Sequence, residues 1–476
     1  MRLRLLRHPL GDGFDARTVF AALHSSGDAF WLDSGPGGRA VLGTGERVAL
    51  PAGEVLPTLR RELAELHLDA PLDGLPLGLV GWLGYEVRGE TTGATVRTRG
   101  RHPDAAFLRV DRLVAVEGDG SATLFALGTE WEGELAAWRD RTASTLATAV
   151  SRPAAARHSS PTSTSRPVER LHGDRATQLV EERTAAGGTR LETGVTTAPP
   201  TTAPVIWHDT PARYLAHIDA CRAAIHEGEA YQLCLTTEAR VAGAFDALEV
   251  FDAVRASSAT HHGGILRIGE TTLVAASPER FLQVTPDGLV RTSPIKGTRR
   301  RDPVPEHDAR LREELAASEK ERAENLMIVD LMRNDLSRVC ELGTVAVTGL
   351  LEVESYPHVH QLVSTIEGRL LPDAGVVDAI AACFPAGSMT GAPKLRAIEV
   401  LDGLEQRARG PYAGAFGYLA ADGSADLAMT IRTIVLDPDG ASVGTGGGIT
   451  SGSDPQAELD EARLKAAALL DALSVG

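Results

Sequence analysis

Lysine is scarce in this 476-residue chain: four of the 48 basic residues are lysines, and all the others are arginines. A biased codon supply can leave so few by chance. However, an arginine stays protonated at any working pH, whereas a partly buried lysine can lose its proton and act as a nucleophile. Lys296 is the strongest candidate for such chemistry, because Pro294 and Gly297 enclose it in a short turn. Lys320, within the charged run 318–322, is as easily an ordinary solvated residue.

Cysteine is equally scarce, and its spacing is uninformative. Cys221, Cys234, Cys340 and Cys383 are scattered, without a Cys-x-x-Cys pair. This usage excludes a disulfide scaffold and suits a reducing cytosol.

An excess of positive charge is also missing. The formal net charge is −16, and the sequence contains no basic stripe interleaved with aromatic residues. Nucleic acid is therefore excluded as an expected partner. An anionic substrate would need local hydrogen-bond donors or a metal ion to be held by so acidic a chain.

Long apolar runs are absent as well. The most apolar stretch, 75–85, contains three glycines and a proline and is too short to span a bilayer. The basic start at Met1 is followed by Pro9, Gly11 and Asp12, which interrupt any signal-like core. We therefore expect a cytoplasmic protein without a membrane partner.

With 476 residues the chain is longer than chains that usually fold around a single hydrophobic core, so two or more lobes are expected. The clearest seam is 151–204, whose ends are rich in Pro, Ser, Thr and Ala and cannot bury enough apolar surface to order themselves. A polar helix is predicted inside it at 174–186. The seam separates an N-terminal region, 1–150, from a larger domain, 205–474.

Periodicity predicts both helices and strands in each region. Helices are predicted at 58–66, 211–227, 306–338 and 455–472. Strands are predicted at 40–42, 107–110, 112–116, 265–268, 272–276, 344–347, 359–366 and 427–436. Neighbouring strands without regular βαβ alternation indicate an α+β protein with large antiparallel sheets.

One carboxylate lies on the apolar face of its predicted helix. Met327, Ile328 and Leu331 follow Glu324 at i+3, i+4 and i+7, so the Glu324 carboxylate points inward. A buried carboxylate needs a partner. One interpretation is that an arginine pairs with the Glu324 carboxylate, and the alternative is that another cation does.

The last predicted helix begins with Asp454 as N-cap and Pro455 in the first turn. Glu458, Glu461 and Lys465 then fall on one face. An intrahelical Glu–Lys pair worth ~0.3–0.5 kcal/mol is the ordinary interpretation. The alternative is a divalent metal site shared with a second helix, which Mg²⁺ would fill with one or two carboxylates, waters and substrate oxygens.

A glycine-rich segment, 444–452, directly precedes that helix. It predicts a loop, either a plain tight turn or a set of backbone N–H donors for an anion next to a helix N-terminus.

Five segments, taken together, resemble the chorismate-utilising enzymes. They occur in the order in which that family carries them, strongly over 205–474 and more weakly in the N-terminal region. The segments are Ser277-Pro278-Glu279-Arg280-Phe281, Pro294-Ile295-Lys296-Gly297-Thr298, 322–335, 387–394, and 446–448 with Glu461. The resemblance implies a two-subdomain α+β sandwich of large antiparallel sheets flanked by helices, as in anthranilate synthase component I, with the active site between them.

Lys296 distinguishes among the activities of that family. Anthranilate-forming members carry alanine in this pentapeptide. The lysine form resembles the aminodeoxychorismate-forming members, which convert chorismate and ammonia to 4-amino-4-deoxychorismate. Members that add water have a lysine in the segment where this chain has Gln232. Alternatives that stay open are synthesis of anthranilate or 2-amino-2-deoxyisochorismate, and a non-catalytic chorismate-binding subunit.

The resemblance also implies roles for individual residues. Lys296 would be the covalent nucleophile and Glu279 the acid and base. Mg²⁺ would be held by Glu324 and Glu461, with Glu458 close by. The implied substrate contacts are Arg432, Tyr412, Thr390, Gly391, Gly446, Gly447, Gly448, Lys465 and Gln361. Gln361 stands where the family commonly has a histidine, and the adjacent His360 would point to the other face of its strand.

Ammonia is expected from a separate glutamine amidotransferase subunit in a heterodimer. None of the four cysteines lies in the glycine-rich nucleophile turn that a triad glutaminase needs. In addition, 30–34 loosely resembles a segment near which relatives hold a regulatory amino acid, and an ordinary strand end is the alternative.

Overall fold

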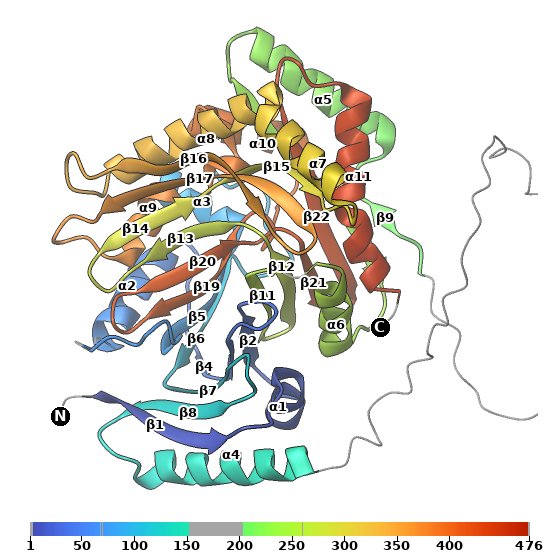
Figure 1. Ribbon diagram of the computed structural model, residues 1–476. Helices are drawn as coiled ribbons and strands as arrows, with labels where there is room; N and C mark the ends of the chain where they lie inside the picture. The colour runs from blue at the N-terminus through green and yellow to red at the C-terminus, as the bar shows by residue number, and fades with distance from the viewer. Residues whose placement is uncertain (1–2, 67, 69, 152–202, 259, 475–476) are drawn as a thin grey trace, which may run out of the picture.

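The computed structural model describes residues 3–66, 68, 70–151, 203–258 and 260–474. Two large antiparallel sheets make up the body of the molecule, and helices surround them (Figure 1). The predicted α+β class and the predicted sandwich of antiparallel sheets are therefore confirmed.

The two sheets contain strands from both ends of the chain. In spatial order the first sheet has β1 (Arg4–Gly11), β8 (Ala122–Gly128), β7 (Arg112–Val116), β3 (Ala40–Gly43), β2 (Ala29–Asp33), β11 (His262–Ile268), β12 (Thr271–Ser277), β21 (Thr433–Asp437), β22 (Gly440–Ile449), β10 (Gln232–Ala242) and β18 (Gly391–Ala392), with β9 (Ile206–Trp207) also on β10. The second has β15 (Ile295–Arg300), β17 (Val359–Arg369), β14 (Leu289–Ser293), β13 (Arg280–Val284), β20 (Ala425–Met429), β19 (Ala415–Ala420), β5 (Gly78–Leu83), β6 (Ala105–Val110) and β4 (Glu46–Arg47), with β16 (Ala346–Ser355) also on β17.

Helices cover the outer faces and the ends of the sheets (Figure 1). They are α1 (Ala16–Leu23), α2 (Val55–Leu66), α3 (Arg88–Thr92), α4 (Gly133–Ser151), α5 (Pro211–His226), α6 (Ala247–Ser257), α7 (Pro305–Ala317), α8 (Glu319–Ser337), α9 (Val376–Cys383), α10 (Lys394–Glu405) and α11 (Pro455–Ala472). Among the described residues no helix is long and apolar enough to cross a membrane.

The main core lies between the sheets, as the alternation along β12 shows. Leu273 and Ala275 belong to the large inner cluster, whereas Val274 and Ala276 belong to the cluster on the outer face of the first sheet. This alternation follows from the period of two in a strand. Both faces of the first sheet are therefore buried.

Residues 427–436, predicted as one strand, form parts of two. β20 belongs to the second sheet and β21 to the first. The chain crosses between the sheets at 430–432, where Arg432 has a left-handed φ of +50°. The prediction was wrong because nothing in the apolar pattern marks this crossing.

The predicted helix 306–338 is also two elements. Ser318 is extended and ends α7, and its side chain accepts a hydrogen bond from the N–H of Glu321 at the start of α8. A serine N-cap explains the break. By contrast, the helix predicted at 455–472 is confirmed as α11, with Asp454 as its N-cap.

The predicted glycine loop is a strand for most of its length, since β22 continues to Ile449. Close packing explains these glycines better than a turn does. A Cβ on Gly444 would lie 2.1 Å from the Tyr412 ring, and one on Gly446 would lie 2.2 Å from the Leu235 carbonyl oxygen on β10.

The N-terminal region, 1–150, contributes strands to both sheets. Most of the predicted connection 151–204, including the helix predicted at 174–186, lies outside the described residues. 

Buried contacts of Arg409 and Gly410 with Tyr85 and Glu86 tie the N-terminal region to the rest of the chain. Arg409 donates to both carboxylate oxygens of Glu405, at 2.7 and 2.8 Å, and both residues are 3% exposed. The Arg409 guanidinium also lies over the Tyr85 ring, 4.2 Å from its centroid. The Glu86 carboxylate accepts the backbone N–H groups of Arg409 and Gly410.

Candidate active site

The two residues predicted to act on the reacting bonds lie on adjoining segments. Lys296 is on β15, and Glu279 lies in the short link between β12 and β13. The Glu279 carboxylate accepts a 2.8 Å hydrogen bond from Ser388 Oγ and another from the backbone N–H of Ile295, the neighbour of Lys296. The structure therefore brings Lys296 and Glu279 together.

Glu279 is set up to exchange a proton near neutral pH. Burial raises the pKa of Glu279 to about 7, while the Ser388 hydrogen bond, the Lys296 charge and the Ile295 N–H oppose the rise. A carboxyl group with such a pKa can donate a proton and take it back at physiological pH.

Glu324, on α8, has a lysine on each side. Lys296 Nζ lies 4.0 Å from Glu324 Oε2, and Lys320 Nζ lies 4.0 Å from Glu324 Oε1. Lys320 Nζ also donates a 3.3 Å hydrogen bond to Glu458 Oε1 on α11. The prediction of an inward Glu324 is confirmed, since the residue is 8% exposed. Its cationic neighbours are lysines rather than the arginine that one interpretation expected.

Glu461 and Lys465, one turn apart on α11, form the predicted intrahelical pair at 2.8 Å. Lys465 Nζ also donates to the Gly446 carbonyl oxygen at 3.0 Å. Burial alone would raise the pKa of Glu461, but Lys465, and after it Lys320 and Lys296, hold that pKa below its usual value. Three of the four lysines thus surround the three carboxylates predicted to bind a metal.

The residues present fit a magnesium ion that keeps water and substrate ligands. Within the described ranges no group of three or more His, Cys, Asp or Glu is close enough to hold a metal by itself. However, Glu324 Oε1 is buried and accepts no hydrogen bond from the described part of the chain. Glu324 and Glu458 also share one cation, the Lys320 ammonium. Mg²⁺ commonly takes only one or two protein carboxylates, so this arrangement suits it.

Arg432 and Tyr412 lie at the same end of the site. Arg432 Nη1 donates to the Lys465 carbonyl oxygen at 3.2 Å, and burial lowers the pKa of its guanidinium, which Tyr412 and Glu461 partly offset. The Tyr412 ring packs on Gly444 and is 7% exposed, and burial raises the pKa of its phenol.

The other predicted substrate contacts are backbone groups or buried polar side chains on β22, β18 and β17. Gly446, Gly447 and Gly448 pair with β10 on one edge of β22, while β21 covers the other edge only as far as Val443. Gly391 pairs with Leu233. Gln361 is 6% exposed, and its β17 position faces Thr298, two residues beyond Lys296.

Two of the residues singled out from the sequence have structural partners. The Thr390 hydroxyl donates to the carbonyl oxygens of Ala386 and Gly387, so its proton is already used in hydrogen bonds to the backbone. His360 contacts Asp308 at 3.0 Å and Ser355 at 2.8 Å, which gives it a place in the packing of β17 against α7 and β16.

Gln232 belongs to the site, although the sequence marked it only as a position without lysine. It is 1% exposed, and neither its amide nitrogen nor its amide oxygen has a hydrogen-bond partner among the described residues. A Cβ on Gly448 would lie 2.1 Å from Gln232 Nε2 and 3.5 Å from Lys296 Nζ. The available signal was a glutamine opening an apolar run at the start of β10.

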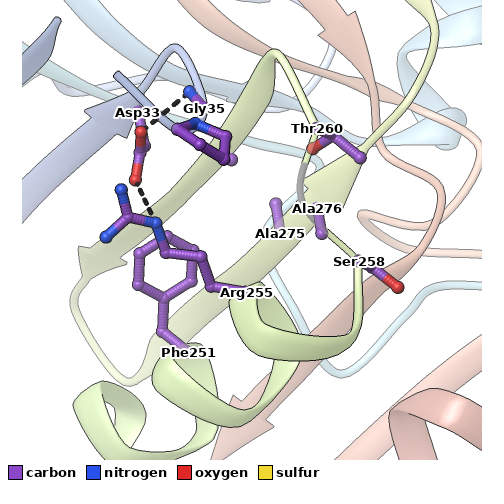
Figure 2. A pocket seen from close by; sticks show the side chains of 10 residues that line it. Asp33, Gly35, Phe251, Arg255, Ser258, Thr260, Ala275 and Ala276 are labelled. Carbon is purple, nitrogen blue, oxygen red and sulfur yellow. Dashed lines mark hydrogen bonds and ion pairs between the residues drawn. The ribbon is translucent and has the colours of Figure 1, made fainter. Parts of the chain in front are cut away.

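Residues 30–34 have an ordinary structural role (Figure 2). The Asp33 carboxylate accepts the Gly35 N–H at 2.8 Å and pairs with Arg255 at 2.9 Å. The cavity beside them is about 10 Å³, roughly the space for one water molecule. An amino acid would not fit there, so the strand-end interpretation agrees better with this geometry.

Comparisons with known proteins identify the family of the chain. The family model for chorismate binding enzymes matches residues 27–471. The chain is 39% identical to aminodeoxychorismate synthase of Streptomyces pristinaespiralis, over 96% of this chain and 64% of that protein. It is 35% identical to anthranilate synthase component 1 of Mycolicibacterium smegmatis, over 91% of this chain and 79% of the relative.

The fold is similar to that of a solved structure, anthranilate synthase component I of Streptococcus pneumoniae. The TM-score is 0.70 at 24% identity, covering 98% of this chain and 92% of the other. The chain spans about two thirds of the length of the two Streptomyces aminodeoxychorismate synthases that it matches, 64% in each case. The motifs, the fold and the family match lead to one conclusion: the chain belongs to the chorismate binding enzyme family.

Proposed function

We propose that this chain converts chorismate and ammonia to 4-amino-4-deoxychorismate. The observation that carries the proposal is a lysine, Lys296, on β15 beside a buried carboxyl group, Glu279, whose pKa is about 7. The similarity to aminodeoxychorismate synthases over nearly the whole chain supports it. Synthesis of anthranilate is the second candidate, favoured by the similarity to anthranilate synthase component 1.

A lysine nucleophile explains how an amine can replace the C4 hydroxyl with retention, because two successive displacements restore the original stereochemistry. The neutral Lys296 amine attacks C2, the two conjugated ring double bonds shift, and the C4–O bond breaks. Ammonia then attacks C4, both double bonds shift back, and the C2–N bond to Lys296 breaks. Covalent catalysis by an amine divides one unfavourable replacement into two feasible steps.

Glu279 would carry the protons in both steps. In the first, its protonated carboxyl gives a proton to the departing hydroxyl, which leaves as water. In the second, the carboxylate takes a proton from the nitrogen that has attacked C4. The Ser388 hydrogen bond holds the carboxyl in position for both transfers.

Glu324 and Glu461, with Glu458 close by, would hold Mg²⁺. When bound, the ion would draw electron density from the ring carboxylate of chorismate and so ease departure of the hydroxyl. The buried Glu324 oxygen without a hydrogen bond supports this assignment. Glu324 would bring the metal close to Lys296, whose Nζ lies 4.0 Å from Glu324 Oε2.

Substrate carboxylates would be held by residues around the open edge of β22. The Arg432 guanidinium suits bidentate pairing with the enolpyruvyl carboxylate. Tyr412, Lys465 and the backbone of Gly446 to Gly448 would complete the contacts to the carboxylates. Gly391 and Thr390 would also line the substrate site. Gln361 would supply a hydrogen bond to the ring.

Ammonia would come from a separate glutamine amidotransferase subunit. All four cysteines are free and buried. Burial raises the pKa of the Cys221 thiol to about 12 and that of Cys340 to about 11, and it raises the pKa of Cys234 and of Cys383 as well. A glutaminase needs a reactive thiolate in the opposite kind of environment. Free thiols also suit the expected cytoplasmic location.

The experiment that tests the proposal is product identification. The purified chain is incubated with chorismate, Mg²⁺ and ammonium salt, and the product is assigned by mass and NMR. We expect 4-amino-4-deoxychorismate with its C4 stereochemistry retained. Anthranilate as the main product would support the second candidate, and absence of any turnover would support a non-catalytic chorismate-binding subunit.

A further inference from the structure

Lys320 links two carboxylates that belong to different helices. It lies in the first turn of α8, and its ammonium hydrogen-bonds Glu458 Oε1 on α11 at 3.3 Å. The same nitrogen lies 4.0 Å from Glu324 Oε1, one turn further along α8. The charged run around Lys320 predicted a solvated side chain, yet its end lies between two buried acids.

These two acids need a cation between them. Glu324 is 8% exposed and Glu458 is 4% exposed, and two buried carboxylates facing one another are unfavourable unless a positive charge separates them. Glu458 also accepts a 2.7 Å hydrogen bond from Ser453 Oγ. Glu324 Oε1 accepts none from the described residues, and the burial of this carboxylate is offset by the charge of Lys296 and, after it, by that of Lys320.

The other nearby lysines have different partners. Lys296 approaches the opposite oxygen of Glu324, at 4.0 Å. Lys465 is occupied by Glu461 and by the Gly446 carbonyl. Lys320 is therefore the lysine that reaches both Glu324 Oε1 and Glu458.

We propose that Lys320 is a built-in counter-ion that competes with Mg²⁺ for Glu324 and Glu458. Its ammonium holds the two carboxylates together when the metal is absent and moves into solvent when the metal binds. The Lys320 side chain is 54% exposed and has a flexible four-carbon stem, so this movement requires no change in the packing of α8. The inference rests on the metal site of the proposed function.

Competition makes two opposite predictions for a variant without the ammonium. Removing Lys320 removes a positive charge from the place that Mg²⁺ must enter, so Mg²⁺ should bind more tightly. It also leaves Glu324 and Glu458 without the one cation that they share, so the metal-free protein should be less stable. A lysine that served only to bind chorismate would change neither quantity.

The test compares Lys320→Met with Arg333→Met, a matched control on the same helix. Arg333 is half-exposed and pairs with Asp330, so its replacement removes the same charge away from the site. Mg²⁺ affinity is measured by titration calorimetry and thermal unfolding is measured with and without Mg²⁺, using the full chain without chorismate. Lys320→Gln is a second variant in case the methionine protein folds poorly.

We expect Lys320→Met to bind Mg²⁺ about three- to ten-fold more tightly than the parent, because the ion no longer has to displace an ammonium–carboxylate contact at ~4 Å in largely aqueous surroundings. Its melting temperature without Mg²⁺ should fall, its rise on adding Mg²⁺ should be larger, and Arg333→Met should match the parent in both. Unchanged or weaker Mg²⁺ binding by both Lys320 variants, with normal binding by the parent, would overturn the counter-ion role. If the parent itself binds no Mg²⁺, the metal site of the proposed function fails, and this inference fails with it.

Discussion

Lys296 Nζ lies 4.0 Å from the Glu324 carboxylate, so the proposed nucleophile and a proposed metal ligand are direct neighbours. Lys320 and Glu458 extend this contact to α11. The scarcity of lysine in the chain therefore has a structural counterpart: three of its four lysines meet at one group of acids. The fourth, Lys394, pairs with buried Asp335 at the far end of α8.

The metal assignment predicts the effect of removing single negative charges. Glu324→Gln and Glu461→Gln should each abolish most activity and weaken Mg²⁺ binding at least about ten-fold, because each loses an anionic ligand. The fold should survive, since burial already raises the pKa of Glu324 and a neutral side chain costs less there. Glu319→Gln, at an exposed position on the same helix, is the control. Mg²⁺ titrations that match the parent in both variants would contradict the assignment.

Glu279 should give the reaction a pH dependence near neutrality. Its pKa is about 7, and the first proposed step needs the protonated carboxyl, so kcat/KM for chorismate should fall as the pH rises through about 7. Glu279→Gln should be nearly inactive at every pH. A parent profile that is flat between pH 6 and pH 8 would argue against Glu279 as the acid.

The same pKa predicts a stability effect. Glu279 ionises at about 4.5 when unfolded and at about 7 when folded, so the folded state binds more protons between these values. The free energy of unfolding should therefore decline across this window, by up to about 3 kcal/mol, from the contribution of this residue. Denaturant unfolding at pH 4.5 and pH 7.5 should show that Glu279→Gln lacks this part of the decline. Identical pH dependence in the two proteins would show that folding does not raise the pKa of Glu279.

The Arg409–Glu405 pair should be important for stability. Arg409→Met leaves the Glu405 carboxylate buried without its partner, which should cost about 3–5 kcal/mol in the free energy of unfolding. Arg396→Met, which removes a half-exposed arginine paired with Glu399, should cost less than about 1 kcal/mol. Chemical denaturation measures both. Equal costs for the two variants would mean that the buried pair contributes no more than a surface pair.

The proposed need for a glutaminase subunit determines which nitrogen source the chain alone should be able to use. The purified chain should aminate chorismate with concentrated ammonium salt and should show no turnover with glutamine alone. Addition of a glutaminase subunit should make glutamine effective, because a shared channel raises the local ammonia concentration. Product formation is followed with each nitrogen source in parallel. Turnover with glutamine by the rigorously purified chain would contradict the need for a partner.

Local patterns were sufficient for some of these features. Asp454 and Pro455 mark the start of α11, and the spacing of apolar residues places Glu324 inward, because both depend on residues within one or two helical turns. The break at Ser318 was missed, although a serine N-cap is also a local signal.

Contacts between distant segments were not predictable in this way. Lys320 and Glu458 are 138 residues apart, so the charged run around Lys320 could not indicate their contact. The chain crosses at Arg432 because β20 pairs within the second sheet and β21 pairs within the first. The apolar residues on the two sides of Arg432 follow one continuous strand pattern, so the sequence did not mark the crossing.

The proposed covalent bond between Lys296 and the substrate is tested by the rate of 4-amino-4-deoxychorismate formation by Lys296→Ala with chorismate, Mg²⁺ and ammonia. Lys296→Arg serves as a second variant that keeps the positive charge but cannot act as a nucleophile. Both rates should fall by more than about 1,000-fold, as expected when a covalent nucleophile is removed. Formation of the same product at the parent rate by Lys296→Ala would show that Lys296 is not the covalent nucleophile.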